Sequence, residues 1–146
     1  MDSVIEFMKK NAVFHSVMTY NCDRKSFRLD SYDNTNQGVY FILYEEDILK
    51  IGKADGQEGL KGRLKTYRSR LVKNFENGDS TVALWNRVMT GVLNGRVLSI
   101  YVLPIEPEKK LFHGIKVELS IVRSLELELS KLAKQQGHSL QLSGQN

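Results

Sequence analysis

The chain carries tyrosine and lysine at a spacing that suits chemistry on a phosphate group. Tyr40 and Lys50 stand in two apolar runs, 38–44 and 48–52, which flank the acidic stretch Glu45-Glu46-Asp47. Such runs of β-branched and aromatic residues around a turn predict a β-hairpin. With the turn at 45 and 46, Tyr40 is expected opposite residue 50 or 51, with Cβ atoms about 5 Å apart.

A helix after the hairpin is predicted to add a second cation and a second phenol. Its apolar stripe, at spacings of three and four, consists of Leu60, Leu64, Tyr67, Leu71 and Phe75. Arg63 and Tyr67 are four residues apart and therefore share one side of the helix. Two cations and two phenols can hold a phosphate and stabilise charge on its oxygens. Nearby cations also favour the phenolate form of a tyrosine. Taken singly, each residue has a plainer interpretation, as packing or as a salt bridge.

A carboxylate for a metal ion is sought on the last predicted helix, from about 115 to 136. Its apolar stripe is Ile115, Leu119, Val122, Leu129 and Ala133, and Glu126 falls within that stripe. Carboxylates are rarely buried without a partner, so Glu126 is the preferred metal ligand. Glu118 lies in the wider apolar arc, and Glu128 lies at its polar edge.

The charge distribution favours a polyanionic partner. The formal net charge is +4, and the stretch 50–73 carries eight Lys or Arg residues against Asp55 and Glu58. Such a cluster suits a phosphate backbone, and the alternative is a solvated helix face. Lys53, Lys61, Arg68 and Arg70 are the residues expected to contact flanking phosphates of DNA.

The elements that must position these residues form a small α/β (α+β) domain. The first 36 residues predict a short helix near 4–14 and strands near 16–20 and 26–30. The pattern then predicts the hairpin, a helix from 59 or 60 to about 75, and a helix from 79 or 80 that Gly95 closes. A strand at 97–104, a loop and the last helix follow. This order predicts about three mainly antiparallel strands flanked by helices. We expect an N-terminal extension at 1–37, the domain at 38–137 and a polar tail at 138–146.

The composition is typical of a cytoplasmic protein. The chain has 146 residues, enough for one domain, and a single cysteine, Cys22, which cannot form an intrachain disulfide. No apolar run approaches the roughly 20 residues of a membrane helix. The N-terminus lacks the pattern of a secretory signal.

These residues together resemble the GIY-YIG nuclease superfamily. The resemblance rests on GVY at 38–40, KIG at 50–52, the helix with Arg63 and Tyr67, the Ser80-Thr81 helix start, and LELEL at 125–129. It is most similar to the branch that contains phage endonuclease II and restriction-type enzymes. The resemblance implies a three-stranded antiparallel sheet flanked by helices.

The resemblance also implies roles for five residues. Tyr40 would be the general base or water-orienting phenolate, Arg63 would stabilise the reacting phosphate, and Glu126 would bind one Mg²⁺ (or Mn²⁺). Tyr67 takes a position that is tyrosine or histidine in the family. Lys50 replaces the second motif tyrosine. A family asparagine about a dozen residues after the glutamate is missing, and His138 and Ser139 stand in that region.

The expected function is therefore a metal-dependent DNA endonuclease with no membrane partner. Cutting both strands would need a homodimer or a larger assembly, whereas a monomer would nick. The alternative is a GIY-YIG-like module that binds DNA or regulates without cleaving. A third alternative is an unrelated small α/β regulator.

Overall fold

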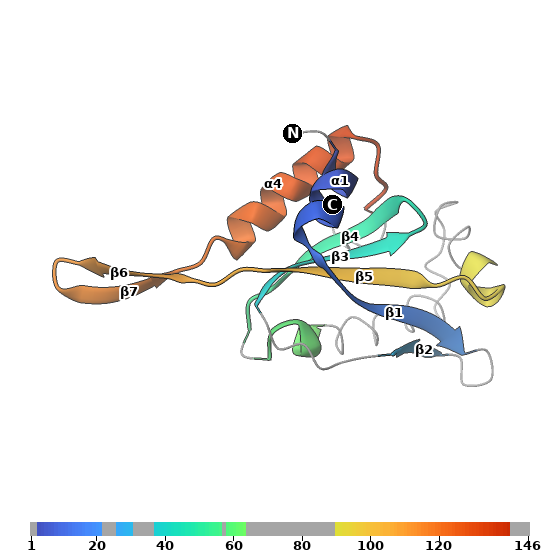
Figure 1. Ribbon diagram of the computed structural model, residues 1–146, viewed down its shortest axis with the longest axis horizontal. Coiled ribbons are helices and arrows are strands. Elements are labelled where there is room, and N and C mark those ends of the chain that lie inside the picture. The colour runs from blue at the N-terminus through green and yellow to red at the C-terminus, as the bar shows by residue number, and fades with distance from the viewer. Residues whose placement is uncertain (1–2, 22–25, 31–36, 57, 64–89, 141–146) are drawn as a thin grey trace.

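The computed structural model describes residues 3–21, 26–30, 37–56, 58–63 and 90–140. These residues form an α+β fold with one five-stranded sheet and one two-stranded sheet (Figure 1). The predicted class, helices on a mainly antiparallel sheet, is confirmed. Most of the two predicted helices between 60 and 95 lies outside the described residues, and so do Tyr67, Arg68, Arg70 and the tail from 141 onward.

The larger sheet is antiparallel throughout and contains more strands than predicted. Its strands are β1 (Val13–Asn21), β2 (Ser26–Leu29), β3 (Gly38–Tyr44), β4 (Asp47–Ala54) and β5 (Leu98–Pro104). Their order is β2-β1-β5-β3-β4, so β5 lies between two hairpins that are distant in sequence. The strands β1 and β2 belong to the prelude and are integral to the sheet.

Strand β3 is buried on both faces and divides the core into two layers. Tyr40, Ile42 and Tyr44 point into one apolar cluster, together with Leu60 and Val92. Its alternate residues Val39, Phe41 and Leu43 point into the other cluster. Because successive side chains of a strand face opposite sides, all seven residues of β3 are buried.

Two helices cover the face of this sheet on which Val39, Phe41 and Leu43 lie (Figure 1). They are α1 (Val4–Asn11) and α4 (Val122–Gln135), which bury Val4, Met8, Val122, Leu129 and Ala133 in the same cluster as β3. Ser3 caps α1 by accepting a hydrogen bond from the N–H of Glu6. The N–H of Val4 donates to Oε1 of Gln136 at 2.7 Å, which ties the start of α1 to the end of α4.

The prediction of one long helix from 115 to 136 was wrong in its first part. Residues 108–119 form a hairpin of β6 (Glu108–Phe112) and β7 (Ile115–Leu119), and α4 begins only at Val122. Ile115 and Leu119 are therefore strand residues, 65% and 46% exposed, and not part of a helical stripe. Ile115, Leu119 and Val122 are spaced by four and three residues, which is the spacing of one helix face. The chain instead forms a hairpin whose turn is His113-Gly114.

Glycines end two helices as predicted. Gly95 has φ +89° and donates its N–H to the Val92 carbonyl, while Arg96 donates to Gly91. Gly137 has φ +87° and repeats this pair of bonds at the end of α4, where His138 donates to Ala133. Both are Schellman motifs, in which the left-handed residue is ordinarily glycine. In the part of the chain that is described, no helix is long and apolar enough to cross a membrane.

Candidate active site

The predicted hairpin exists, but its register differs from the predicted one. Tyr40 lies opposite Gly52, and Lys50 lies opposite Ile42. The expectation that Tyr40 would face residue 50 or 51 was therefore wrong. The reason is a β-bulge at Leu49, which adds one residue to β4 between the pairs Leu43–Ile48 and Ile42–Lys50.

This bulge decides which face of the sheet Lys50 belongs to. Counting from the turn pair Tyr44–Asp47 without a bulge would place Lys50 opposite Phe41, on the face that α4 covers. A shift of one residue exchanges the two faces of a strand. With the bulge, Lys50 pairs with Ile42, on the same face as Tyr40. Bulges are enriched beside active sites because they redirect a side chain in this way.

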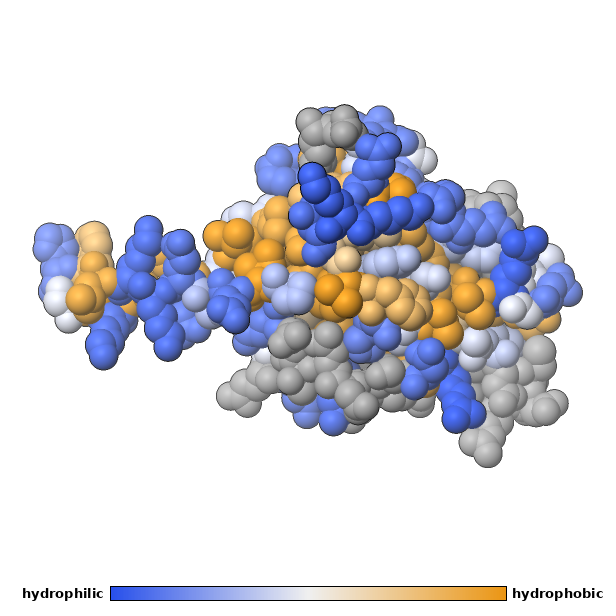
Figure 2. All heavy atoms as spheres, in the orientation of Figure 1, coloured by the Kyte–Doolittle hydropathy of each residue, from blue (hydrophilic) through white to orange (hydrophobic). Residues whose placement is uncertain are grey.

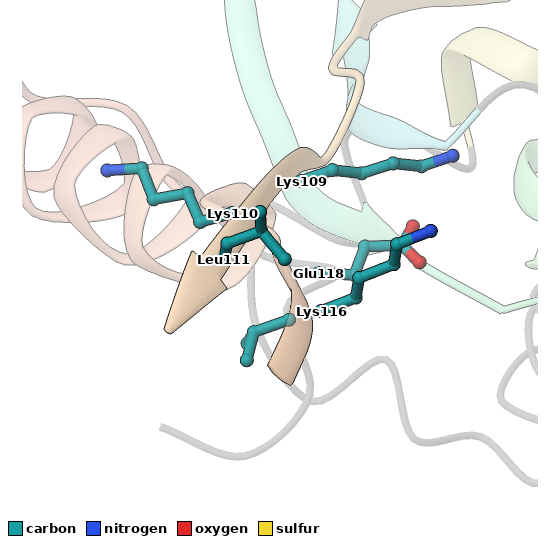
Figure 3. Close-up of a pocket in the computed structure, with 6 residues that line it drawn as sticks. Lys109, Lys110, Leu111, Lys116 and Glu118 are labelled. Carbon is teal, nitrogen blue, oxygen red and sulfur yellow. The ribbon is translucent and has the colours of Figure 1, made fainter. Parts of the chain in front are cut away.

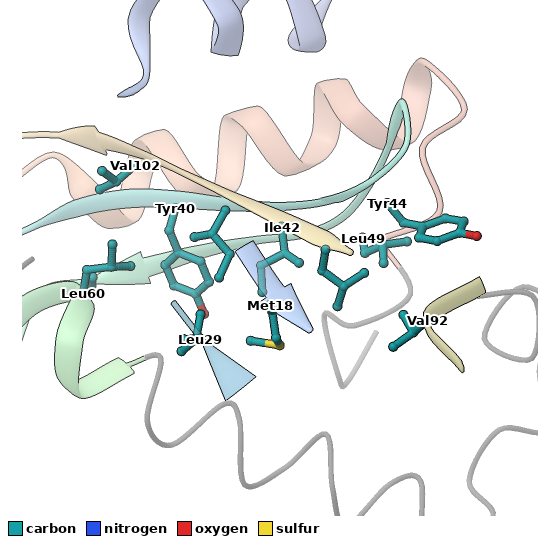
Figure 4. Packing of buried hydrophobic residues seen from close by; sticks show 12 residues of the cluster. Met18, Leu29, Tyr40, Ile42, Tyr44, Leu49, Leu60, Val92 and Val102 are labelled. Carbon is teal, nitrogen blue, oxygen red and sulfur yellow. The ribbon is translucent and has the colours of Figure 1, made fainter. Parts of the chain in front are cut away.

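Tyr40 is enclosed in the core (Figure 4). The whole residue is 0% exposed and belongs to the cluster with Met18 and Leu60. Its ring lies directly over Gly52, since a Cβ built on that glycine would collide with the ring carbon Cζ and the phenol oxygen. The glycine of KIG is thus what makes room for the tyrosine of GVY.

Lys50 and Glu126 border a common cavity of about 200 Å³ between β4 and α4. The other residues that line it are Ile51, Leu127, Ser130, Lys131, Lys134 and Leu140. By register Lys50 lies on the Tyr40 face of the sheet, opposite the face that α4 covers. It borders this cavity all the same, because β4 is an edge strand of the described sheet. Two of the predicted site residues, Lys50 and Glu126, therefore line one cavity.

The three candidate glutamates are now distinguishable by their positions. Glu118 lies on β7 and is exposed, away from α4. Glu128 is exposed on α4 and pairs with Lys131 at 3.4 Å. Glu126 is half-buried and lines the cavity with Lys50. Of these three glutamates only Glu126 lines that cavity, and its role as the metal ligand stays a prediction.

Arg63 lines a second cavity, of about 240 Å³, at the end of β4. Its neighbours there include Lys53, Asp55, Glu58 and Gly62. Lys53 pairs with Asp55 at 3.6 Å, and Arg63 is exposed at the end of the described helical residues 59–63. The two cavities share no lining residue in the described chain, so Arg63 and Glu126 are not in one cavity here. Lys61 is half-buried nearby in sequence.

Sequence reasoning missed three polar residues of the Lys50–Glu126 cavity. Ser130 and Lys134 follow Glu126 by four and eight residues, and Lys131 follows it by five. The intervals of four and eight place Ser130 and Lys134 on the side of Glu126, whereas Lys131 lies further around the helix. The spacing of Ser130 and Lys134 was therefore visible in the sequence, but the denser cluster of cations at 50–73 is the stronger signal.

His138 and Ser139 stand where the family asparagine is missing, and both hold the hairpin. The Nδ1 atom of His138 accepts a hydrogen bond from the N–H of Ile48 at 3.1 Å. The N–H and hydroxyl of Ser139 donate to the two carboxylate oxygens of Asp47 at 3.0 and 2.8 Å. Leu140 then donates to the carbonyl of Ile48. This segment covers the outer edge of β4.

The residues around Glu126 fit a magnesium ion that is held by one protein carboxylate together with waters and a substrate phosphate. Among the described residues, no three His, Cys, Asp or Glu side chains gather into a metal-binding group. Mg²⁺ is often held by one or two carboxylates, several waters and a substrate phosphate. Among the residues that the structure describes, Glu126 is the one carboxylate that lines its cavity, and Ser130, one turn along the helix, lines it too. The residues therefore fit an ion that substrate helps to hold.

Comparisons with known proteins find this fold in two solved structures. No model of a known protein family matches the chain, and no curated protein matches it. A mutant of bacteriophage T4 EndoII is similar in structure, with 15% sequence identity and a TM-score of 0.62, over 87% of this chain and 92% of that one. Restriction endonuclease HPY188I in complex with product DNA is similar at 16% identity and a TM-score of 0.51, over 89% of this chain and 76% of that one. At these identities the likeness shows the fold, and the fold that the sequence resemblance implied is confirmed.

Proposed function

We propose that this chain is a GIY-YIG-like, metal-dependent DNA endonuclease that hydrolyses phosphodiester bonds beside the edge of β4. The observation that carries the proposal is the cavity shared by Lys50 and Glu126. The fold of two endonucleases supports it. The bulge at Leu49 bears on Tyr40 instead, because it places Lys50 on the same face as this proposed water-orienting residue.

The cations of the chain hold the substrate in this proposal. Lys50 contacts the scissile phosphate, and its charge favours the pentacovalent form in which negative charge grows on the oxygens. Arg63 lines a separate cavity at the end of β4, and we propose that it reaches the same phosphate when DNA is bound. Lys131 and Lys134 neutralise the next phosphates along the strand, which fixes the position of DNA without reading its sequence.

Glu126 would hold the metal ion through its carboxylate. When bound, Mg²⁺ (or Mn²⁺) would stabilise the charge on the departing 3′-oxygen.

Tyr40 is proposed to orient the attacking water, and Tyr67 to assist it. The enclosed position of Tyr40 beside Gly52 also suits a second candidate, a DNA-binding module without cleavage. In that case Tyr40 is only a core residue. The hydroxyl can be tested separately from the ring with Tyr40→Phe, with Tyr44→Phe as the control on the same strand and the same face.

Plasmid cleavage tests the proposal. Supercoiled plasmid is incubated with the full chain in Mg²⁺ or in EDTA, and nicked and linear forms are followed on a gel. We expect Mg²⁺-dependent nicking by the wild type and a loss of about a hundredfold or more in Glu126→Gln, because a metal ligand is removed. Glu128→Gln, two residues away on the exposed face, should cleave like the wild type.

The outcomes separate the two candidate functions. Cleavage by Glu126→Gln at the wild-type rate contradicts the assigned metal ligand. No cleavage by any variant, together with a salt-sensitive mobility shift, supports the binding module instead. Loss of cleavage in Tyr40→Phe but not in Tyr44→Phe supports the water-orienting role, whereas equal activity in both returns Tyr40 to packing.

A further inference from the structure

The segment that follows α4 turns back onto β4 and holds this strand by its backbone. The N–H of Ile48 donates to Nδ1 of His138 at 3.1 Å, and the carbonyl of Ile48 accepts a hydrogen bond from the N–H of Leu140 at 3.1 Å. Both polar backbone groups of one edge-strand residue are therefore occupied, much as a neighbouring strand would occupy them. We call residues 138–140 the strap.

The strap is fastened both to α4 and to the turn of the main hairpin. The N–H of His138 donates to the carbonyl of Ala133 in the last turn of α4. Ser139 donates its N–H and its hydroxyl to the two carboxylate oxygens of Asp47 at 3.0 and 2.8 Å. Hydrogen bonds to an ionised acceptor are among the stronger ones. The strap thus joins the end of α4 to the start of β4.

The strap also forms one wall of the cavity that Lys50 and Glu126 line. Leu140 is 4% exposed and lines this cavity. Ile48, which the strap holds, directly precedes the bulge at Leu49, and Lys50 follows that bulge. Glu126 lies on α4, the helix to whose end the strap is fastened. The relative position of these two cavity residues, which lie on different elements, therefore depends on the strap.

The backbone of the strap is strained. Leu140 has φ +45°, in the left-handed region, which side chains larger than those of asparagine and aspartate rarely adopt. A strained conformation of this kind persists only while the surrounding contacts impose it. Loss of one contact should therefore loosen the strap as a whole and not only the bond that is lost.

The contact between Ile48 and His138 requires a neutral imidazole ring. Because Nδ1 accepts a hydrogen bond, this nitrogen carries no proton, and the proton of the neutral ring lies on Nε2. A proton added to Nδ1 would turn the acceptor into a donor that faces the N–H of Ile48. Histidine ordinarily gains its second proton between about pH 8 and pH 5. Mild acid can therefore remove this contact.

The charges around His138 favour an exchange of partners when the ring is protonated. Oδ1 of Asp47 lies 3.6 Å from Nδ1 and is the acidic contact of the ring. Glu46, in the turn, is exposed and pairs with Lys9 of α1 at 3.2 Å. Lys134, the basic residue in the last turn of α4, is also exposed. A protonated ring is therefore drawn towards Asp47 and away from the backbone of β4.

We propose that the strap is a pH-sensitive fastening of the cavity, in which neutral His138 holds β4 to the end of α4 and protonation of His138 releases Ile48 and Leu140. The release itself does not depend on nuclease activity. Its effect on cleavage rests on the proposed function: acid should lower the rate, because the cavity loses a wall and the separation of Lys50 and Glu126 is no longer fixed.

Nitrogen NMR of the uniformly ¹⁵N-labelled wild-type chain gives the first test and needs no variant. Long-range ¹H–¹⁵N spectra show which ring nitrogen carries the proton. At about pH 7.5 we expect the proton of His138 on Nε2, and on acidification we expect the amide resonance of Ile48 to follow the titration of this ring. A neutral ring protonated on Nδ1 contradicts the proposal, and so does an Ile48 resonance that does not move with the ring.

Amide hydrogen exchange measures the release. The protection of Ile48 and Leu140, corrected for intrinsic rates, should fall by about fivefold or more between about pH 7.5 and pH 5.5, because each amide loses a hydrogen bond. In His138→Asn the side-chain oxygen replaces Nδ1 and stays an acceptor, so the protection should not depend on pH. In His138→Phe it should be low at both pH values. A pH dependence that persists in His138→Asn would overturn the proposal.

His113 supplies the matched control. It is exposed in the turn of the β6–β7 hairpin, which extends beyond the body of the molecule (Figure 1 and Figure 2). Charged side chains of this hairpin extend to both of its sides (Figure 3). The ring of His113 contacts Phe112, with centroids 4.4 Å apart. His113→Asn should keep the wild-type pH dependence at Ile48, and loss of that dependence would contradict the assignment to His138.

Plasmid cleavage in Mg²⁺ connects the strap to the proposed function. Between about pH 7.5 and pH 5.5 the wild type should lose about threefold or more activity relative to His138→Asn, since only the wild type releases the strap. Equal pH profiles would overturn the role of the strap at the cavity. If neither protein cleaves at any pH, the proposed function fails, whereas the NMR and exchange results still decide whether the strap responds to pH.

Discussion

At the scale of single residues, the glycines of GVY and KIG are required by close packing. A Cβ on Gly38 would collide with the backbone carbonyl of Leu103, so this glycine lets β5 approach β3. A Cβ on Gly52 would collide with the ring of Tyr40. The two glycines therefore support the same candidate site, one by positioning a strand and the other by admitting a side chain.

Substitution of Gly52 should destabilise the fold. In Gly52→Ala the added methyl must displace the Tyr40 ring in a filled core, which typically costs about 1–3 kcal/mol. Gly56→Ala is the matched control, because a Cβ there has no atom within 4 Å. Urea unfolding followed by circular dichroism measures both. Equal midpoints for the two variants would show that the ring moves aside freely.

Residue identities were predictable where they depend on local pattern and not where they depend on register. Glu126 was singled out because a carboxylate interrupts an apolar stripe; it lies half-buried on α4, and its role stays a prediction. The partner of Tyr40 was missed, because no composition rule announces a bulge at Leu49. Lys131 and Lys134 of α4, which line the cavity, were not predicted, because the cluster of cations at 50–73 is denser.

At the scale of elements, the turn of the main hairpin is held by three distant segments. Glu45, which has φ +56°, pairs with Arg96 at 2.8 Å, and Glu46 pairs with Lys9 of α1 at 3.2 Å. Asp47 accepts two hydrogen bonds from Ser139. The exposed ion pairs contribute little, so the bonds at Asp47 are the stronger attachment.

Removal of the Asp47 carboxylate should weaken this attachment. Hydrogen bonds to a charged group are worth about 1.5–3 kcal/mol, so Asp47→Ala should lower the free energy of unfolding by about that amount. Asp55→Ala, which removes a more exposed carboxylate that pairs with Lys53 at 3.6 Å, should cost much less. Thermal and urea unfolding check both variants. Similar losses would mean that Ser139 does not anchor the hairpin.

Element types were predictable except where a short strand resembled a helix. The strands β3, β4 and β5 have clear periodicity, and the structure contains them. The short helix expected near 4–14 is present but ends at Asn11, because β1 begins at Val13. The hairpin of β6 and β7 was missed because its strands are five residues long and its turn is His-Gly. That pair of residues is a weaker hairpin signal than Asn-Gly or Asp-Gly.

At the scale of the whole molecule, the proposed contacts with DNA predict a defined salt dependence. Each phosphate neutralised by a lysine adds about 0.9 to the slope of log affinity against log salt. Lys50→Met and Lys134→Met, measured in EDTA by fluorescence anisotropy, should each lower that slope by about one. Lys10→Met, an exposed lysine of α1, should leave the slope unchanged. A slope unaffected by Lys50 and Lys134 would move the DNA path elsewhere.

The strand order could not have been derived from the sequence. Local pattern shows where β1 and β2 lie, but not that β5 inserts between β1 and β3. That arrangement depends on which apolar faces fit together over long separations. Only the completed core decides it.

The position of β5 has a consequence for synthesis on the ribosome. The β1–β2 pair and the β3–β4 pair emerge early, but no strand joins them until Leu98–Pro104 has left the exit tunnel. Until then each hairpin presents an unpaired edge, and isolated hairpins are marginal in water. The sheet therefore closes late, across pairs such as Val13–Val102. Such non-local closure is slow, and a nascent chain that stalls before β5 would be a natural substrate for chaperones.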